Sequence, residues 1–198
     1  MLGMTATEMF LTGDSAADAL LAGDPNALLL GMVLDQQVPM EKAFGGPAVI
    51  AERMGGRLDV RAIADADPDE FAALCSQRPA IHRFPASMAK RVQATCRVLT
   101  DSYDGDAANV WADVADGDEL LRRIAALPGF GAAKAPIFVA LLGKQYGVQP
   151  PGWRAAAGVY GEAGSHRSVA DVVDQPSLEL VRAAKKAAKA AAKAAGGG

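Results

Sequence analysis

The sequence has few of the residues that build metal centres. Its 198 residues include two cysteines, Cys75 and Cys96, and two histidines. The cysteines lack the closely spaced partners that a zinc ion or an iron–sulfur cluster needs, so we predict no metal site. We expect both cysteines to be buried free thiols of a reducing compartment.

Long apolar segments are also missing. No run of about 18 apolar residues occurs, so we expect no membrane-spanning segment and no membrane partner. The amino-terminal segment carries acidic residues early and has no basic region before an apolar run. That pattern is not a secretory signal, and we expect the protein to be cytoplasmic.

The charge is acidic overall but unevenly distributed. The net charge is −3, yet residues 182–198 carry five basic residues and no acid, while residues 1–181 hold 15 basic and 23 acidic residues. Residues 78–97 contain five basic residues and no acid, and residues 101–119 contain seven acids and no base. Local clusters, rather than net charge, decide whether a phosphate backbone can dock. Nucleic-acid binding is therefore not excluded.

The local signals are those of helices. The composition is rich in alanine and 51% hydrophobic, which favours helix over strand. Asp24 and Pro25 predict the start of a helix that is apolar all round and ends by Pro39. Two glycines, Gly45 and Gly46, predict a break between two helices.

We predict an all-α fold with two helical lobes and a cleft. The expected domain spans residues 1–180 and includes a helical hairpin over residues 118–146. Residues 181–198 form a Lys/Ala-rich basic tail, which either holds DNA nonspecifically or only aids solubility.

The segment LPGFG, from Leu127 to Gly131, separates two helical stretches. Gly129 and Gly131 permit positive φ and let another backbone approach closely. The N–H groups of the turn and of the next helix's first turn lack partners, which together with the helix dipole makes an anion site. Lys134 adds positive charge. This pattern favours a phosphate-binding hairpin, and an ordinary αα-hairpin with a glycine turn is the alternative.

The hairpin pattern resembles the helix-hairpin-helix motif that binds the DNA backbone without reading sequence. The segment LLLGMVLDQQVPMEKAF resembles the early helix of the helix-hairpin-helix base-excision glycosylases, which precedes the hairpin in the same order. The resemblance covers residues 21–146. It is closer still to a small bacterial base-excision repair-like family that keeps LDQQVPMEKAF, LPGFG and GKQYGV-PPGW and lacks an iron–sulfur cluster.

The resemblance implies a monomeric DNA N-glycosylase that flips a damaged base out of double-stranded DNA in the nucleoid. It implies no cofactor, and it allows a monovalent cation at the hairpin. One glutamine of the Gln-Gln pair would enter the duplex where the base is flipped out. The DNA-contacting residues expected on this basis are Gln36, Gln37, Arg83, Lys90, Arg91, Leu127, Gly129, Phe130, Gly131 and Lys134.

Two family positions differ in this chain. The position of the lysine that lyases use holds Ala133, and Lys134 follows one residue later. One helical residue is a rotation of about 100°, so we expect Lys134 to point elsewhere and the enzyme to be monofunctional, without lyase activity. The position of the family's catalytic aspartate holds Pro151.

Two aspartates remain as candidate catalytic acids. Asp35 closes an apolar helix, where an anion is unfavourable and a cleft acid is a candidate base. Its alternative is a solvated carboxylate that caps the next turn. Asp171 would reach the cleft only if an insertion shifts the alignment.

Other side chains keep two interpretations. His82, together with nearby basic residues, lines a phosphate track or a plain solvated face. Trp111 and Trp153 stack on a flipped base or belong to the core. For the whole chain, the alternatives to a glycosylase are a non-catalytic DNA lesion-binding protein of glycosylase ancestry and a helical protein-interaction domain.

Overall fold

A computed structural model describes residues 8–195. Every regular element in this range is a helix, which confirms the predicted all-α class. The elements are α1 (Ser15–Gly23), α2 (Pro25–Leu34), α3 (Met40–Arg53), α4 (Val60–Asp65), α5 (Pro68–Ser76), α6 (Pro85–Ser102), α7 (Ala108–Trp111), α8 (Gly117–Ala125), α9 (Ala135–Gln145), α10 (Trp153–Ala156), the 3-10 turns η1 (Gly158–Gly161) and η2 (Val169–Asp171), and α11 (Gln175–Ala195).

Many of the acidic residues begin helices. An aspartate carboxylate at the N-cap accepts hydrogen bonds from the free N–H groups of the first turn and complements the helix dipole. Five of the 23 acidic residues therefore define where helices begin. The aspartates in this role are Asp14, Asp24, Asp59, Asp67 and Asp116.

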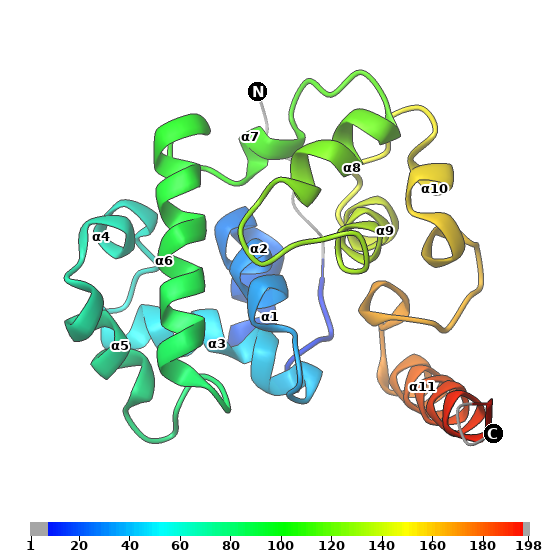
Figure 1. Cartoon of the computed structure of the whole chain (residues 1–198), viewed down its shortest axis with the longest axis horizontal. Helices are drawn as coiled ribbons and strands as arrows, with labels where there is room; N and C mark the ends of the chain where they lie inside the picture. The colour runs from blue at the N-terminus through cyan, green and yellow to red at the C-terminus, as the bar shows by residue number, and fades with distance from the viewer. Residues whose placement is uncertain (1–7, 196–198) are drawn as a thin grey trace.

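Helix α2 lies at the centre of the fold. Its residues 27–34 are all buried, as the uniformly apolar sequence predicts. Figure 1 shows α4, α5 and α6 on one side of the α1–α3 layer and α7 to α10 on the other. The two helical groups share one continuous hydrophobic core with α2, so the site described below lies between elements that are fixed by packing.

The predicted break at Gly45 and Gly46 is wrong. Helix α3 runs without interruption through both glycines and through Pro47. A Cβ atom at Gly46 would lie 2.4 Å from Cδ1 of Leu34 on α2. The glycine therefore serves the close approach of two helices rather than a turn.

The basic carboxyl-terminal segment is part of a docked helix. Helix α11 begins at Gln175, inside the predicted domain, and Ser177, Leu178 and Val181 in its first turns are buried. Arg182 forms an ion pair with Glu41 at the start of α3. The lysines that follow are thus held in a defined direction by the first part of the same helix.

Among residues 8–195, no single helix is both long and apolar enough to cross a membrane. The pair α1 and α2 reaches that length and composition only when taken together, and it is bent by 114°.

Candidate nucleic-acid interface and active site

The hairpin turn between α8 and α9 exposes unpaired donors. The N–H groups of Gly129, Gly131, Ala132 and Ala133 make no hydrogen bond within the described part of the chain. Gly131, Ala132 and Ala133 are exposed. These donors sit just before a helix N-terminus, where the dipole favours an anion. The arrangement suits a phosphate group, as the sequence pattern predicts.

The two glycines of the turn do different things. Gly129 has a φ of 85°, and a Cβ atom there would lie 2.7 Å from Cδ of Arg91 on α6. Gly131 has no atom within 4 Å of its would-be Cβ. Gly129 is therefore needed by the fold, whereas Gly131 leaves space on the outer surface for a ligand.

Two apolar side chains and a hydroxyl fasten the turn. Leu127 is buried, and the ring of Phe130 packs 5.5 Å from that of Phe138 on α9. The Thr95 hydroxyl on α6 donates to the Pro128 carbonyl at 3.2 Å. The side chains of Leu127 and Phe130 thus hold the loop in place.

Lys134 is not on the helix. Helix α9 begins at Ala135, because Pro136 occupies its first turn and the preceding residues form a turn closed on the Gly131 carbonyl. Lys134 is the N-cap residue, and its backbone already lies in the right-handed helical region, with φ −92° and ψ −35°. The expected rotation of Lys134 relative to Ala133 stays a prediction.

The Lys134 ammonium group points inward to the end of α2. It donates to the carbonyls of Met32 at 2.7 Å and Val33 at 3.2 Å, which complements the negative end of the helix dipole. Burial lowers the pKa of Lys134 to about 8, and nearby Asp35 opposes that shift. The lysine is thus a partly buried amine beside an acid.

Asp35 is the C-cap residue of α2. Burial raises the pKa of its carboxyl, and the charges of Lys185 and Lys134 oppose this while Glu41 adds to it. No hydrogen bond from the described residues contributes to holding this carboxylate charged. A half-buried acid whose pKa is raised by burial is a candidate catalytic group.

The two glutamines after Asp35 are held differently. The Gln36 amide donates to the Val33 carbonyl at 3.0 Å and accepts from Arg91 Nη1 at 2.6 Å. Gln37 is exposed and has a positive φ of 56°. The structure therefore leaves Gln37, not Gln36, free to extend outward.

The buried His82 side chain forms a hydrogen bond to this segment. The residue is 2% exposed, so both predicted interpretations of His82, a phosphate track and a plain solvated face, are wrong. Its Nδ1 accepts from the Phe84 N–H at 2.9 Å, which leaves Nε2 to donate to the Gln36 carbonyl at 2.9 Å. Phe84 beyond it is 46% exposed, with the Arg83 guanidinium over its ring.

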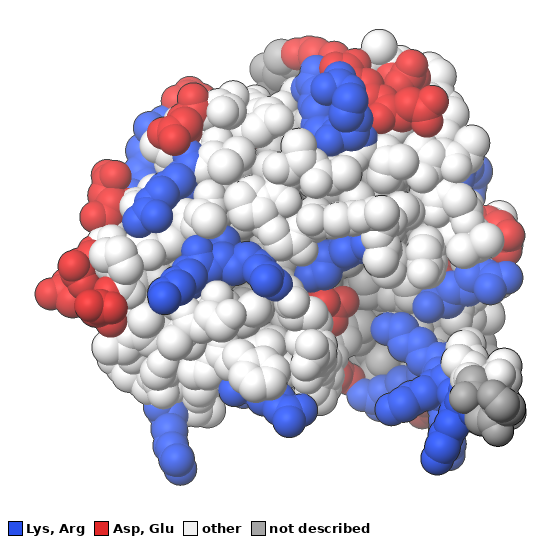
Figure 2. Space-filling view, viewed as in Figure 1, with Lys and Arg blue, Asp and Glu red and all other residues white. Residues whose placement is uncertain are grey.

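Two basic residues of α6 differ in exposure, as the two glutamines do. Lys90 is exposed, while Arg91 spans from the turn at Gly129 to the Gln36 amide. Figure 2 shows basic side chains over α6 and over α11, with acidic side chains in the hollow between them. Sequence reasoning missed the linking role of Arg91, because nothing local marks it.

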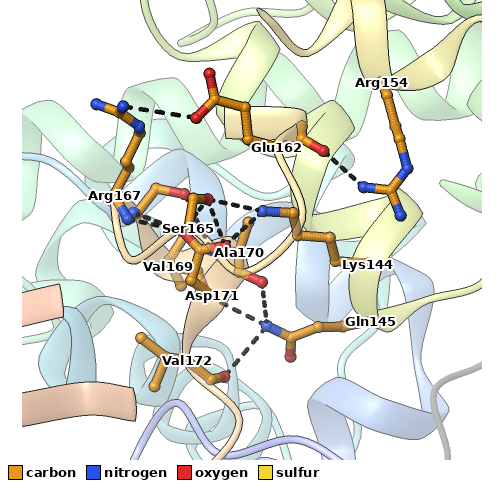
Figure 3. A network of polar contacts seen from close by, with 12 residues as sticks. Lys144, Gln145, Arg154, Glu162, Ser165, Arg167, Val169, Ala170, Asp171 and Val172 are labelled. Carbon is orange, nitrogen blue, oxygen red and sulfur yellow. Dashed lines mark hydrogen bonds and ion pairs between the residues drawn. The ribbon is translucent and has the colours of Figure 1, made fainter. Parts of the chain in front are cut away.

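Asp171 lies in a closed network shown in Figure 3. Its carboxylate accepts from Lys144 Nζ at 2.5 Å, from the Ser165 hydroxyl, and from the N–H groups of Arg167 and Ser168. The Asp171 side chain is 3% exposed. This arrangement favours a structural role, in which Asp171 fastens η2 and the preceding loop to α9.

The other candidates are structural. Trp111 and Trp153 are buried, which agrees with the core interpretation. Pro151 lies in the turn before α10, where its carbonyl accepts from the Gly117 N–H at 2.8 Å. Cys75 and Cys96 are buried free thiols, and burial raises the pKa of each to about 12.

Over the described residues, the all-helical fold with an exposed glycine turn that presents free N–H groups is typical of helix-hairpin-helix proteins. The family model for the HhH-GPD superfamily base excision DNA repair protein matches residues 30–195, and the chain belongs to that family. It is therefore a base-excision DNA repair protein with a DNA-binding fold. A search of the curated proteins found no significant match.

Proposed function

We propose that the protein is a monofunctional DNA N-glycosylase that removes a damaged base from double-stranded DNA as a monomer. The observation that carries the proposal is the position of Asp35. This half-buried acid adjoins the exposed Gln37 and shares the end of α2 with Lys134 of the hairpin.

In this proposal the hairpin holds the DNA backbone. The free N–H groups of the turn bind a phosphate next to the lesion, and exposed Arg83 and Lys90 contact phosphates along α6. Gln37 enters the space that the flipped base leaves. Phe84, exposed and linked to the same segment through His82, inserts into the stack as an apolar wedge.

The chemistry falls to Asp35. Its carboxylate takes a proton from a water molecule that adds to C1′ of the flipped nucleotide. The N-glycosidic bond breaks, its electron pair leaves with the base, and the base takes up a proton from solvent. The negative charge also stabilises the positive charge that develops on the sugar.

No cofactor is proposed for this reaction. The carbonyl oxygens of Gly129 and Phe130 accept no hydrogen bond within the described residues. They are therefore free to coordinate a monovalent cation at the hairpin. Such an ion would help to bind a phosphate.

A second candidate is favoured by the pKa of Lys134, which burial lowers to about 8. The uncharged amine is a nucleophile that attacks C1′ while the base leaves with the bonding electron pair. The amine then loses a proton and the C1′–O4′ bond breaks, so that O4′ becomes a hydroxyl and an imine forms at C1′. The enzyme would then also cleave the strand.

The test is base release from duplexes that carry a panel of lesions. Wild type is compared with Asp35→Asn, Lys134→Met and, as a matched control, Asp69→Asn, which changes an exposed acid. The proposal expects release that only Asp35→Asn abolishes, with duplex binding retained.

Borohydride trapping separates the two candidates. A trapped adduct that is lost in Lys134→Met would establish the imine route and refute the monofunctional one. Tight, salt-sensitive binding without release from any lesion would instead indicate a non-catalytic lesion-binding protein.

A further inference from the structure

The lysines of α11 are confined to one side of the helix. Arg182, Lys185, Lys189 and Lys193 follow one another at intervals of three, four and four residues, and Lys186 adjoins them. At about 100° per residue, all five basic residues fall within an arc of about 100°. All remaining residues between positions 183 and 195 are alanine.

The same side of the helix faces the body of the protein. The buried Leu178 lies on the same side of the helix as these basic residues, which we call the basic stripe. Arg182, one turn further along, forms an ion pair with Glu41. One turn further, Lys185 is close enough to Asp35 for its charge to act on that carboxyl. The basic stripe therefore lies on the same side of α11 as the residues that dock the helix, and it extends from them past the candidate active site.

A solubilising tail does not need this arrangement, because charge on any side of the helix would serve. A helix that lies on a membrane surface needs an apolar face opposite its charges. Here the opposite face is alanine, and the exposed Leu180 is the single large apolar residue on it between residues 179 and 195. The arrangement fits a polyanion that lies across the cleft.

We propose that α11 is a second DNA-backbone contact, in which the stripe Arg182, Lys185, Lys189 and Lys193 binds phosphates on the side of Asp35 opposite the hairpin. The inference rests on the proposed function, because it takes the duplex to lie over Asp35. The charges of Lys134, beside the hairpin turn, and of Lys185, on α11, both act on Asp35, so both elements lie near the candidate acid. Figure 2 shows basic side chains over α11, beside the hollow that holds acidic ones.

The experiment measures binding of a short labelled duplex by fluorescence anisotropy over a range of salt concentrations. In the stripe variant, Lys185, Lys189 and Lys193 are replaced by alanine. Each lysine that neutralises a phosphate contributes about 0.9 to the slope of log K against log salt, so the slope should fall by about that amount per contact. Affinity at low salt should fall about tenfold or more.

The decisive control keeps composition and net charge but moves the lysines. The relocated variant carries the same three alanines and places lysine on the opposite, exposed side of α11. Lysine is a good helix former, so circular dichroism should show unchanged helix content. The added substitutions are Ala184→Lys, Ala187→Lys and Ala191→Lys.

The proposal expects the relocated variant to bind as weakly as the stripe variant. Recovery of wild-type binding by relocation would overturn it, because a nonspecific tail would then explain the affinity. Ala132→Glu at the hairpin is the reference. If it weakens binding while the stripe variant does not, the α11 contact is refuted and the hairpin proposal stands.

If wild type binds no duplex, both proposals fail. Binding to anionic vesicles that depends on the stripe, without a matching effect on duplex binding, would also overturn the α11 proposal.

Discussion

Lys134 and Asp35 share the carboxyl end of α2, where the charge of each favours the charged form of the other. Burial acts in the opposite direction on both, since it raises the pKa of the acid and lowers that of the amine. Burial therefore opposes the ion pair that the two charges favour. The chain reaches this arrangement without the family's usual lysine and aspartate positions.

The pKa of Lys134 predicts a pH dependence of stability. It falls from 10.5 to about 8 on folding, so between these values the unfolded chain binds more protons than the folded protein. Lys134 by itself should therefore add up to about 3 kcal/mol to the free energy of unfolding as the pH rises from about 8 to 10.5. The buried Cys75 and Cys96 thiols, whose pKa burial raises from 9.0 to about 12, act in the opposite direction at the upper end of this range, so urea unfolding is compared between two variants. The free energy of unfolding of Lys90→Met, whose lysine is exposed, should rise by that amount relative to Lys134→Met; parallel pH profiles of the two variants would contradict the assignment.

The two hairpin glycines should respond differently to alanine. Gly129→Ala places a side chain at a φ of 85° and against Arg91, so it should lower the free energy of unfolding by about 1 kcal/mol or more. Gly131→Ala meets nothing within 4 Å and should leave stability unchanged, while its methyl group weakens duplex binding.

Thermal unfolding and duplex titration of the two variants separate these effects. Wild-type affinity in Gly131→Ala would show that the phosphate does not approach the turn at this point.

The glutamine pair should divide in a similar way. Gln36→Ala removes the hydrogen bonds to Val33 and Arg91 and should cost about 1 kcal/mol per bond. Gln37→Ala removes an exposed side chain and should leave stability unchanged. If Gln37 fills the space of the flipped base, its loss should slow base release from lesion duplexes more than it weakens binding to undamaged duplex. Slower release from Gln36→Ala alone would contradict this.

Local features of the sequence predicted much of the fold. The Asp24–Pro25 start of α2 and the glycine turn after α8 depend on neighbouring residues, and both are as predicted. Gly46 misled because its role is set by Leu34, which lies on another helix. A glycine that serves a turn and one that serves close packing look the same in sequence.

The candidate site was predicted only in outline. Asp35 and the Gln-Gln pair could be found because they follow an apolar helix, but nothing local shows that Lys134 folds back onto that helix. The approach of Lys185 to Asp35 depends on how α11 docks. The periodic spacing of the α11 lysines was the one available signal.

Asp171 should prove to be a stabilising residue. Asp171→Asn removes the charge that pairs with Lys144, whose side chain is 13% exposed, so an unpaired buried charge remains. Breaking such a pair costs about 3–5 kcal/mol. The double variant Asp171→Asn/Lys144→Met should be less destabilised than the sum of the single ones, as a double-mutant cycle measures. Activity per folded molecule should be unchanged, and its loss in a folded Asp171→Asn protein would restore this acid as a catalytic candidate.

Lys185 should tune the acid at the candidate active site. Its charge lowers the pKa of Asp35 against the effect of burial, so Lys185→Ala should raise that pKa further. If base release requires the ionised carboxylate, activity falls as the pH drops through the Asp35 pKa, and the acid limb of the variant's pH–rate profile should move to higher pH.

Lys189→Ala is the matched control, because it removes one lysine from the same stripe without being among the charges that act on Asp35. A pH–rate profile of all three proteins at fixed salt makes the comparison. Equal shifts in the two variants would mean that the general charge of α11, rather than the position of Lys185, acts on the site.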